Sequence, residues 1–295
     1  MKSLQNKTQT VISASRRTDI PAFYMEWFMS GLKKGFFSIH HPFHNKKIII
    51  PVTPEKVHTI IFWSKNYGPF IHGQYAQKIQ SMGYNIYLHF TINSPSEILE
   101  PGVPLLEDRL YQLKTLGKFI SPEMINWRFD PICKYQLITH NGEVKSFENL
   151  NSLELIAQSV SEIGINRCVT SFMSNYKKIQ SRIKKIPNFR FVSFTQEEKV
   201  NTILKIEKIL QKYKINLFLC CEKNLLSSLP KSSLIKANEC IPNNLLMKHY
   251  GGHLSLRKDY GQRIKKGCKC NASRDVGDYL CHPCLHECLY CYSNK

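Results

Sequence analysis

The chain has 295 residues, of which 42% are hydrophobic and 21% charged, an ordinary balance for a globular protein with a sizeable core. No run approaches the roughly 18 apolar residues of a membrane span, and the N-terminus MKSLQNKTQT lacks the apolar centre of a signal peptide. We therefore expect a cytoplasmic protein with no membrane partner. The formal charge of +19 predicts attraction to DNA, RNA or other polyanions without indicating which one.

Six apolar runs rich in β-branched and aromatic residues recur along the chain, and segments with helical spacing lie between them. We predict strands at residues 10–15, 59–64, 85–92, 124–129, 167–172 and 215–221. Apolar stripes over residues 106–113, 150–163 and 200–210 predict helices that pack against these strands. The alternation indicates an α/β fold with parallel strands.

Two arrangements of such units compete, an open doubly wound sheet and a partial barrel. The glycine fingerprint G-x-G-x-x-G of dinucleotide-binding sheets is missing, so we favour a partial (β/α)6 TIM-like barrel over residues 1–234. Residues 235–295 contain seven of the eleven cysteines and many turn-forming residues, which indicates a C-terminal cysteine-rich segment folded around metal. Barrels of this kind gather their chemistry at the carboxyl ends of the strands. Lys65, Arg128 and Asp130 fall at two of these predicted ends.

Cys284, Cys288 and Cys291 have the spacing C-x3-C-x2-C, which brings three thiolates to one small cluster. Without an export signal, clustered cysteines indicate metal ligation rather than disulfides. A four-iron cube held by three cysteines leaves one iron open to chelate S-adenosylmethionine, and electron transfer then yields a 5′-deoxyadenosyl radical. Zinc and an ordinary electron-transfer cluster are alternatives, because fourth ligands are close in sequence: Cys268, Cys270, Cys281, His282 and His286.

The segment Cys288-Leu-Tyr-Cys291-Tyr-Ser-Asn resembles the cluster motif of radical S-adenosylmethionine enzymes, particularly the spore photoproduct lyase group. Ser293 replaces the alanine of the usual C-x-Y-C-Y-A pattern. Segments 62–66, 99–109 and 127–132 resemble others of that group in the same order. One departure is large, because the cysteines of ordinary radical enzymes follow the first strand, whereas these end the chain.

The whole chain also looks like a bacterial family of uncharacterised function that begins with S-A-S-R-R-T-D-I-P and ends with C-x-C, D-[IV]-G-x-Y and C-x3-C-x-Y-C-Y. Together the resemblances imply a radical enzyme whose [4Fe-4S] cluster, held by Cys284, Cys288 and Cys291, folds back over the barrel mouth. They also imply an electron donor such as flavodoxin or ferredoxin.

For Lys65, Arg128 and Asp130 we expect contacts with S-adenosylmethionine, the cations at its carboxylate and the acid at its ribose hydroxyls. Internal salt bridges at the barrel rim are an equally good interpretation. DNA or RNA is the leading substrate, on the resemblance and the charge, and basic residues concentrate in segments 177–214 and 248–269. Solvated lysine-rich helix faces would account for the same segments.

The pair Cys268-Lys-Cys270 predicts a second iron–sulfur cluster or a zinc ion, completed by Cys281, Cys221 or Cys240; the alternative is a set of free thiols. We interpret Cys133, Cys168 and Cys220 as packing residues. The run His40-His41-Pro-Phe-His44 reads as a surface hairpin or turn rather than a metal site. A rival for the whole chain is a non-catalytic nucleic-acid-binding protein whose tail is a structural zinc or redox-sensing iron–sulfur module.

Overall fold

A computed structural model describes residues 9–40, 46–174, 176–260 and 263–293. Its centre is an eight-stranded sheet in the order β12-β11-β9-β6-β5-β4-β1-β13, and every pairing in it is parallel. The strands are β1 (Thr10–Ala14), β4 (Val57–Ser64), β5 (Asn85–Thr91), β6 (Ile125–Arg128), β9 (Arg167–Thr170), β11 (Asn216–Leu219), β12 (Lys236–Ala237) and β13 (Arg274–Asp275). All six predicted strands are confirmed, and so is the parallel α/β class.

The sheet is wound in one direction from β1 to β12, because each new strand is added at the same edge. This order excludes the doubly wound alternative, in which the direction reverses at the first strand. Right-handed crossovers that always step the same way place the connecting helices on one face. The strand order ends at β12 and β13, so strand pairing among the described residues does not close the sheet into a ring.

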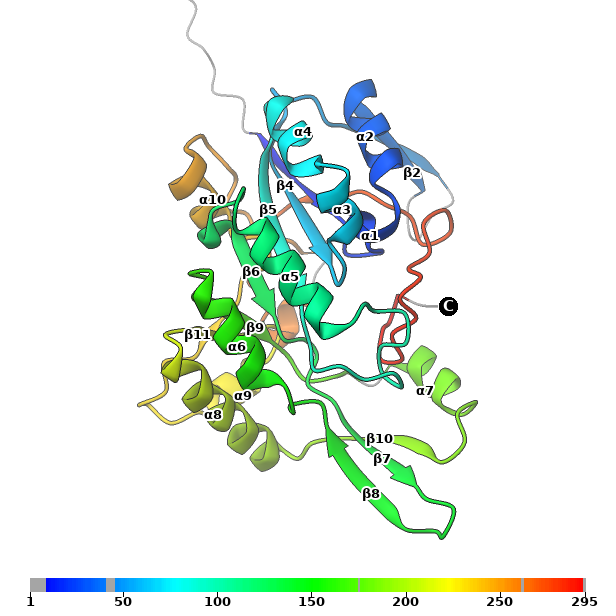
Figure 1. Cartoon of the computed structure of the whole chain (residues 1–295). Helices are drawn as coiled ribbons and strands as arrows, with labels where there is room; N and C mark the ends of the chain where they lie inside the picture. Colours follow the sequence, from blue (N-terminus) through cyan, green and yellow to red (C-terminus); the bar gives the residue numbers. More distant parts are fainter. Residues whose placement is uncertain (1–8, 41–45, 175, 261–262, 294–295) are drawn as a thin grey trace, which may run out of the picture.

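The three helices predicted from apolar stripes are confirmed as α5 (Leu106–Leu116), α6 (Leu153–Glu162) and α8 (Gln196–Lys212). Figure 1 shows α3 to α6 in front of the strands. The remaining helices are α1 (Ile20–Phe23), α2 (Met25–Lys34), α3 (Gly68–His72), α4 (Tyr75–Ser81), α7 (Lys177–Ile183), α9 (Lys223–Ser227) and α10 (Asn243–Tyr250), with 3₁₀ turns at Pro122–Met124 and Ile264–Lys266. Within the described ranges, no helix has the length and apolar character to cross a bilayer.

Two antiparallel additions were not predicted as strands. A three-stranded sheet in the order β10-β7-β8 extends at the bottom of Figure 1; it comprises β7 (Lys134–Ile138), β8 (Val144–Glu148) and β10 (Phe189–Val192). The other is the hairpin of β2 (Phe36–His40) and β3 (Lys47–Pro51). The sequence predicted a surface hairpin or turn around His40, but His41 and His44 lie outside the described residues.

The core fills the space between the sheet and its helices. Phe62, Phe90 and Trp127 are completely buried side chains of three neighbouring strands. The C-terminal segment does not lie apart from this core, because Asp275 in β13 pairs in register with Ser13 in β1. The first and the last strand of the chain are therefore neighbours, and the residues after β13 continue from that edge of the sheet.

Candidate functional site

A cavity of about 1110 Å³ lies where strands β1, β4, β5, β6 and β11 end. Residues that follow these strands line it together with the C-terminal segment. Eight of the nine site residues predicted from the sequence are in its wall: Lys65, Arg128, Asp130, Cys268, Cys270, Cys284, Cys288 and Cys291. The cavity therefore joins groups that are far apart in the sequence at the edge where the strand ends meet.

Cys284, Cys288 and Cys291, which we call the tail triad, reach the cavity because the tail is hydrogen-bonded to the loop after β5. The Gly102 amide donates to the His286 carbonyl at 3.1 Å, and the Leu289 amide donates to the Leu99 carbonyl at 2.9 Å. A Cβ atom on Gly102 would lie 2.7 Å from the Leu285 carbonyl oxygen. This close approach requires glycine, and Figure 1 shows the tail beside the loop that precedes α5.

His286 is a second anchor of the tail, and both of its ring nitrogens have partners. Nε2 lies 2.8 Å from Asp19 Oδ2 and Nδ1 lies 2.9 Å from the Gly102 carbonyl oxygen. Burial alone would lower the pKa of His286, but the hydrogen bond and charge of Asp19 outweigh it and raise this pKa. Asp19 Oδ2 also accepts from Ser64 Oγ and the Lys65 amide, each at 2.9 Å. His286 therefore positions the tail and is not placed as a metal ligand.

Lys65 is largely buried and forms an ion pair with Glu100, with Nζ 2.8 Å from Oε1. Burial opposes charge on both groups, but their attraction dominates, so the pKa of Lys65 is raised and that of Glu100 lowered. Tyr290 donates to the same carboxylate oxygen, and Asn93 Nδ2 donates to it at 2.7 Å. Burial raises the pKa of the Cys288 thiol, and the positive charge of Lys65 opposes this rise. A cation thus stands beside a thiol that must lose its proton to bind a metal.

Arg128 and Asp130 form a second ion pair in the cavity wall. Ser171 Oγ donates to Asp130 Oδ1 at 2.5 Å, and Arg128 Nη1 donates to the Cys240 sulfur at 3.2 Å. Lys65, Arg128 and Asp130, the three residues predicted to contact the cofactor, thus all form salt bridges, which was the alternative interpretation of the sequence. They nevertheless face the same cavity as the tail triad.

Cys268 and Cys270 lie with three further cysteines in what we call the five-thiol ring: Cys220, Cys221, Cys240, Cys268 and Cys270. The Cys220 sulfur lies 3.7 Å from that of Cys221 and 3.8 Å from that of Cys240. The Cys240 amide donates to the Cys270 sulfur at 3.3 Å, and the neighbouring thiols of Cys221 and Cys270 lower the pKa of Cys268, so the five thiols form one group. Cys221 and Cys240 were two of the predicted completing residues. Cys220 was interpreted as packing, whereas it joins the ring and lines the cavity.

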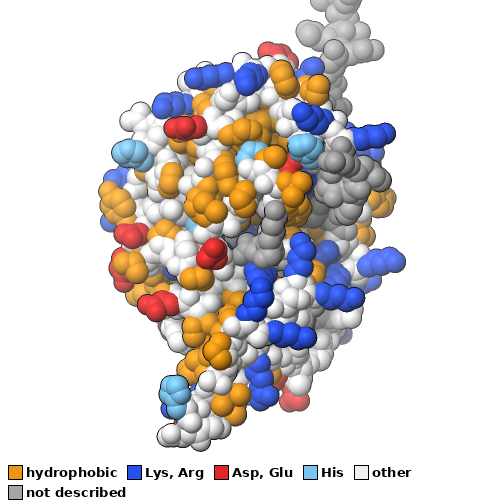
Figure 2. Space-filling view, turned by 90° about the vertical axis from the view of Figure 1, so that its right-hand side faces the viewer, with side chains coloured by type: hydrophobic (Ala, Val, Ile, Leu, Met, Phe, Trp, Pro, Cys, Tyr) orange, Lys and Arg blue, Asp and Glu red, His pale blue; other side chains and the backbone are white. Residues whose placement is uncertain are grey.

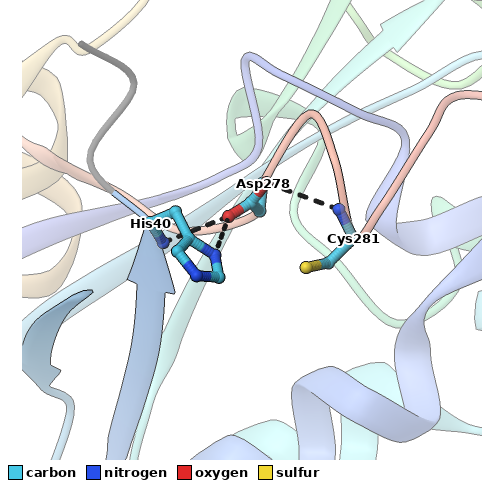
Figure 3. A group of neighbouring side chains, drawn as sticks. All are labelled: His40, Asp278 and Cys281. Atoms are coloured by element: carbon cyan, nitrogen blue, oxygen red, sulfur yellow. Dashed lines mark hydrogen bonds and ion pairs between the residues drawn. The ribbon is translucent and has the colours of Figure 1, made fainter. Parts of the chain in front are cut away.

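Cys281 lies elsewhere, beside His40 and Asp278 (Figure 3). The three ligand atoms are within 4.8 Å of one another. Asp278 Oδ2 accepts from the amide and Nδ1 of His40 at 3.1 and 2.9 Å, and Oδ1 accepts from the Leu280 amide at 2.7 Å. These hydrogen bonds explain why the three residues lie together: Asp278 stabilises its own turn and binds that turn to the end of β2. Cys281 itself is exposed.

Helix α7 lies against the tail and carries a basic surface. Arg182 donates to the Cys288 carbonyl at 3.3 Å and also to that of Cys291. Exposed lysines surround it: Lys177, Lys178, Lys184 and Lys185. Figure 2 shows lysine and arginine side chains gathered at the lower right of the face that looks toward the viewer. The wall of this cavity thus continues into a positively charged surface.

Asp275 helps to hold this site together, and the sequence interpretation assigned it no role. Asp275 accepts from Ser15 Oγ and the Arg16 amide at 3.1 and 3.0 Å, and pairs with Arg17 at 3.1 Å. Asp275 therefore joins residues 13–21, which carry the motif S-A-S-R-R-T-D-I-P, to residues 275–279, which carry the motif D-[IV]-G-x-Y. The sequence offered one indication of this contact: both motifs belong to the family pattern that the whole chain resembles. That pattern did not indicate that the two motifs touch.

A family model described as a domain of unknown function, DUF1848, matches residues 11–293. The chain belongs to this family. The match includes the strands of the central sheet, the five-thiol ring and the tail triad. A search of curated proteins finds no match.

Proposed function

We propose that this protein is a radical S-adenosylmethionine enzyme whose [4Fe-4S] cluster is held by Cys284, Cys288 and Cys291. One observation carries the proposal: the tail triad, although it ends the chain, lines the same cavity as the polar ends of the parallel strands. We further propose that the singly wound sheet is a partial (β/α)6 barrel and that this cavity is its mouth. A cluster carried at the chain's end then has access to the place where such barrels bind substrates.

The residues present fit such a cluster. Three thiols at short spacing leave one iron without a protein ligand, and Lys65 places positive charge beside the buried thiol of Cys288. A cluster bound there would supply one electron, received from a reduced donor, for cleavage of the C5′–S bond of chelated S-adenosylmethionine into methionine and a 5′-deoxyadenosyl radical. Lys65 and Arg128 supply cations for the methionine carboxylate, and Asp130 supplies an acceptor for ribose hydroxyls. Their salt-bridge partners hold these side chains in the cavity wall.

The size of the cavity supports a substrate beside the cofactor. At about 1110 Å³ it exceeds the roughly 300–1,000 Å³ of most small-molecule pockets. The basic helix α7 at the tail favours a polyanionic substrate, and we propose DNA or RNA. The chemistry also needs an electron donor such as flavodoxin or ferredoxin, in a cytoplasmic setting.

A non-catalytic nucleic-acid-binding protein with a structural zinc or redox-sensing tail is the second candidate. A specific observation favours it: the predicted cofactor-binding cations Lys65 and Arg128 are already neutralised by Glu100 and Asp130. In this alternative both ion pairs only brace the rim of the sheet, and the tail cysteines hold a metal without reacting.

Anaerobic reconstitution with iron and sulfide, followed by incubation with S-adenosylmethionine and dithionite, separates the two candidates. We expect 5′-deoxyadenosine to form with the wild type and to be lost in C284A/C288A/C291A. C281S is the matched control, because Cys281 is an exposed tail cysteine outside the cavity wall. A colourless protein that binds zinc and never cleaves the cofactor would contradict the enzyme proposal and leave the second candidate.

A further inference from the structure

The five-thiol ring has features that packing alone does not explain. Its members come from three segments: residues 220–221 follow β11, residue 240 follows β12, and residues 268–270 precede β13. The Cys220 sulfur lies 3.7 and 3.8 Å from those of Cys221 and Cys240, and all five residues line the cavity. Cys221 has a left-handed backbone with φ of 59°, which is uncommon for a residue with a side chain. Five thiols thus converge from distant parts of the chain on one wall.

We propose that the five-thiol ring binds a second, polynuclear iron–sulfur cluster, separate from the tail triad but in the wall of the same cavity. This site does not depend on the proposed reaction of the triad. Iron–sulfur clusters are bound by cysteine thiolates that reach different irons of one cluster. Five thiols outnumber the four ligands that one zinc ion takes, which favours a group larger than a single ion.

The spacing of the sulfurs argues against a single zinc ion. Tetrahedral zinc with Zn–S bonds of about 2.3 Å requires its four sulfurs to lie about 3.8 Å apart in every pair. The Cys220 sulfur meets this distance to those of Cys221 and Cys240, at 3.7 and 3.8 Å. Among the described residues, however, only His40, Asp278 and Cys281 bring three ligand atoms within 4.8 Å of one another. The sulfurs of Cys221 and Cys240 are therefore more than 4.8 Å apart, which is too wide for both to bind one zinc ion together with Cys220.

Donors around the ring are arranged to stabilise thiolates. The Cys240 sulfur accepts from Arg128 Nη1 at 3.2 Å and from Asn238 Nδ2 at 3.1 Å, and the Cys270 sulfur accepts from the Cys240 amide at 3.3 Å. Hydrogen bonds to sulfur and nearby cations are the usual means by which proteins tune iron–sulfur clusters. We assign Cys240, Cys268 and Cys270 as ligands, completed from the adjacent pair Cys220 and Cys221.

A buried histidine fixes the central member of this set. His89 Nε2 lies 2.8 Å from the Cys240 carbonyl oxygen, and Asn126 Nδ2 lies 2.9 Å from His89 Nδ1. The His89 ring stacks on Trp63 with centroids 4.7 Å apart. Because the asparagine donates to Nδ1, the ring donates from Nε2 to the carbonyl and holds Cys240 at the end of the sheet.

The test is to count iron and acid-labile sulfide in the full chain and its variants after anaerobic reconstitution. Wild type should bind about eight irons if each site holds a four-iron cluster. C284A/C288A/C291A should keep about half of the iron, C268A/C270A should keep the other half, and the combined variant should keep none. C281S should match the wild type. Circular dichroism of each variant reports whether it is folded.

Three results would overturn this proposal: wild type that saturates at about four irons, a tail-triad variant without iron, or one zinc ion bound at the ring. The wild-type count does not depend on any variant folding. Failure of the proposed function gives a different result, in which the tail-triad variant keeps its iron while wild type forms no 5′-deoxyadenosine. The two proposals therefore stand or fall separately.

Discussion

The two cysteine groups of this protein share a cavity but are built in opposite ways. The tail triad comes from a single short segment, residues 284–291, and reaches the cavity only because other parts of the chain hold the tail. The five-thiol ring comes from three segments attached to the ends of β11, β12 and β13. In the triad the spacing of the cysteines is local and their location depends on long-range contacts. In the ring the set of cysteines that meet itself depends on the fold.

This difference predicts where each group is vulnerable. Changes that release the tail should affect metal binding at the triad and leave the ring intact, because the ring's segments join the sheet independently of the anchors at Gly102 and Asp19. The anchors can therefore be used to separate the two sites without altering any cysteine.

Removal of the Glu100 carboxylate should have the largest effect. E100A leaves the charge of Lys65 and the buried guanidinium of Arg109 without their partner and removes the acceptor of Tyr290. Breaking a buried ion pair from one side costs about 3–5 kcal/mol of unfolding free energy. Urea unfolding of E100A measures it, and E154A is the control, because its ion pair with Lys212 is exposed. Equal midpoints for the two variants would contradict this prediction.

The His286 anchor should have the next largest effect. H286A removes the ion pair with Asp19 and the contact with the Gly102 carbonyl, and a hydrogen bond to a charged group contributes about 1.5–3 kcal/mol. We expect reconstituted H286A to lose iron from the triad and to keep the iron of the ring. Iron counts in H286A and in H286A/C268A/C270A distinguish the two. If H286A loses the ring's iron as well, the sites are not independent.

Alanine at Gly102 should produce a smaller change of the same kind. Its Cβ atom would lie 2.7 Å from the Leu285 carbonyl oxygen, so the tail must move away. Overpacking of this sort costs about 1–3 kcal/mol. We expect a lower unfolding midpoint in urea and weaker retention of triad iron under a chelator, with ring iron retained as in wild type. A variant with wild-type iron retention at both sites would show that the tail tolerates displacement.

The contrast between local and long-range contacts also explains which parts of the fold and of the site could be predicted from the sequence. The six strands were predictable because their residues are apolar on both faces, whereas β8, whose residues are all exposed, carries no such signal. The triad was predictable from its spacing. Cys220 directly follows an apolar strand and was interpreted as packing, since its sulfur neighbour besides the adjacent Cys221 is Cys240, 20 positions away. The pairing of Asp19 with His286 spans 267 positions, so nothing local indicated it.

Charge reversal on α7 should have the smallest effect and tests whether this helix attracts a polyanion to the cavity. Arg182 ties the helix to the tail triad, and K177E/K178E replaces two of its exposed lysines with acids. We expect binding of a single-stranded oligonucleotide to weaken about tenfold, or about 1.4 kcal/mol, and the salt dependence of the binding constant to become shallower. Fluorescence anisotropy over a series of salt concentrations measures both quantities. K205E/K208E, on exposed positions of α8, makes the same change in net charge on another helix. If the two variants weaken binding equally, the attraction comes from net charge alone, and α7 does not guide nucleic acid to the triad.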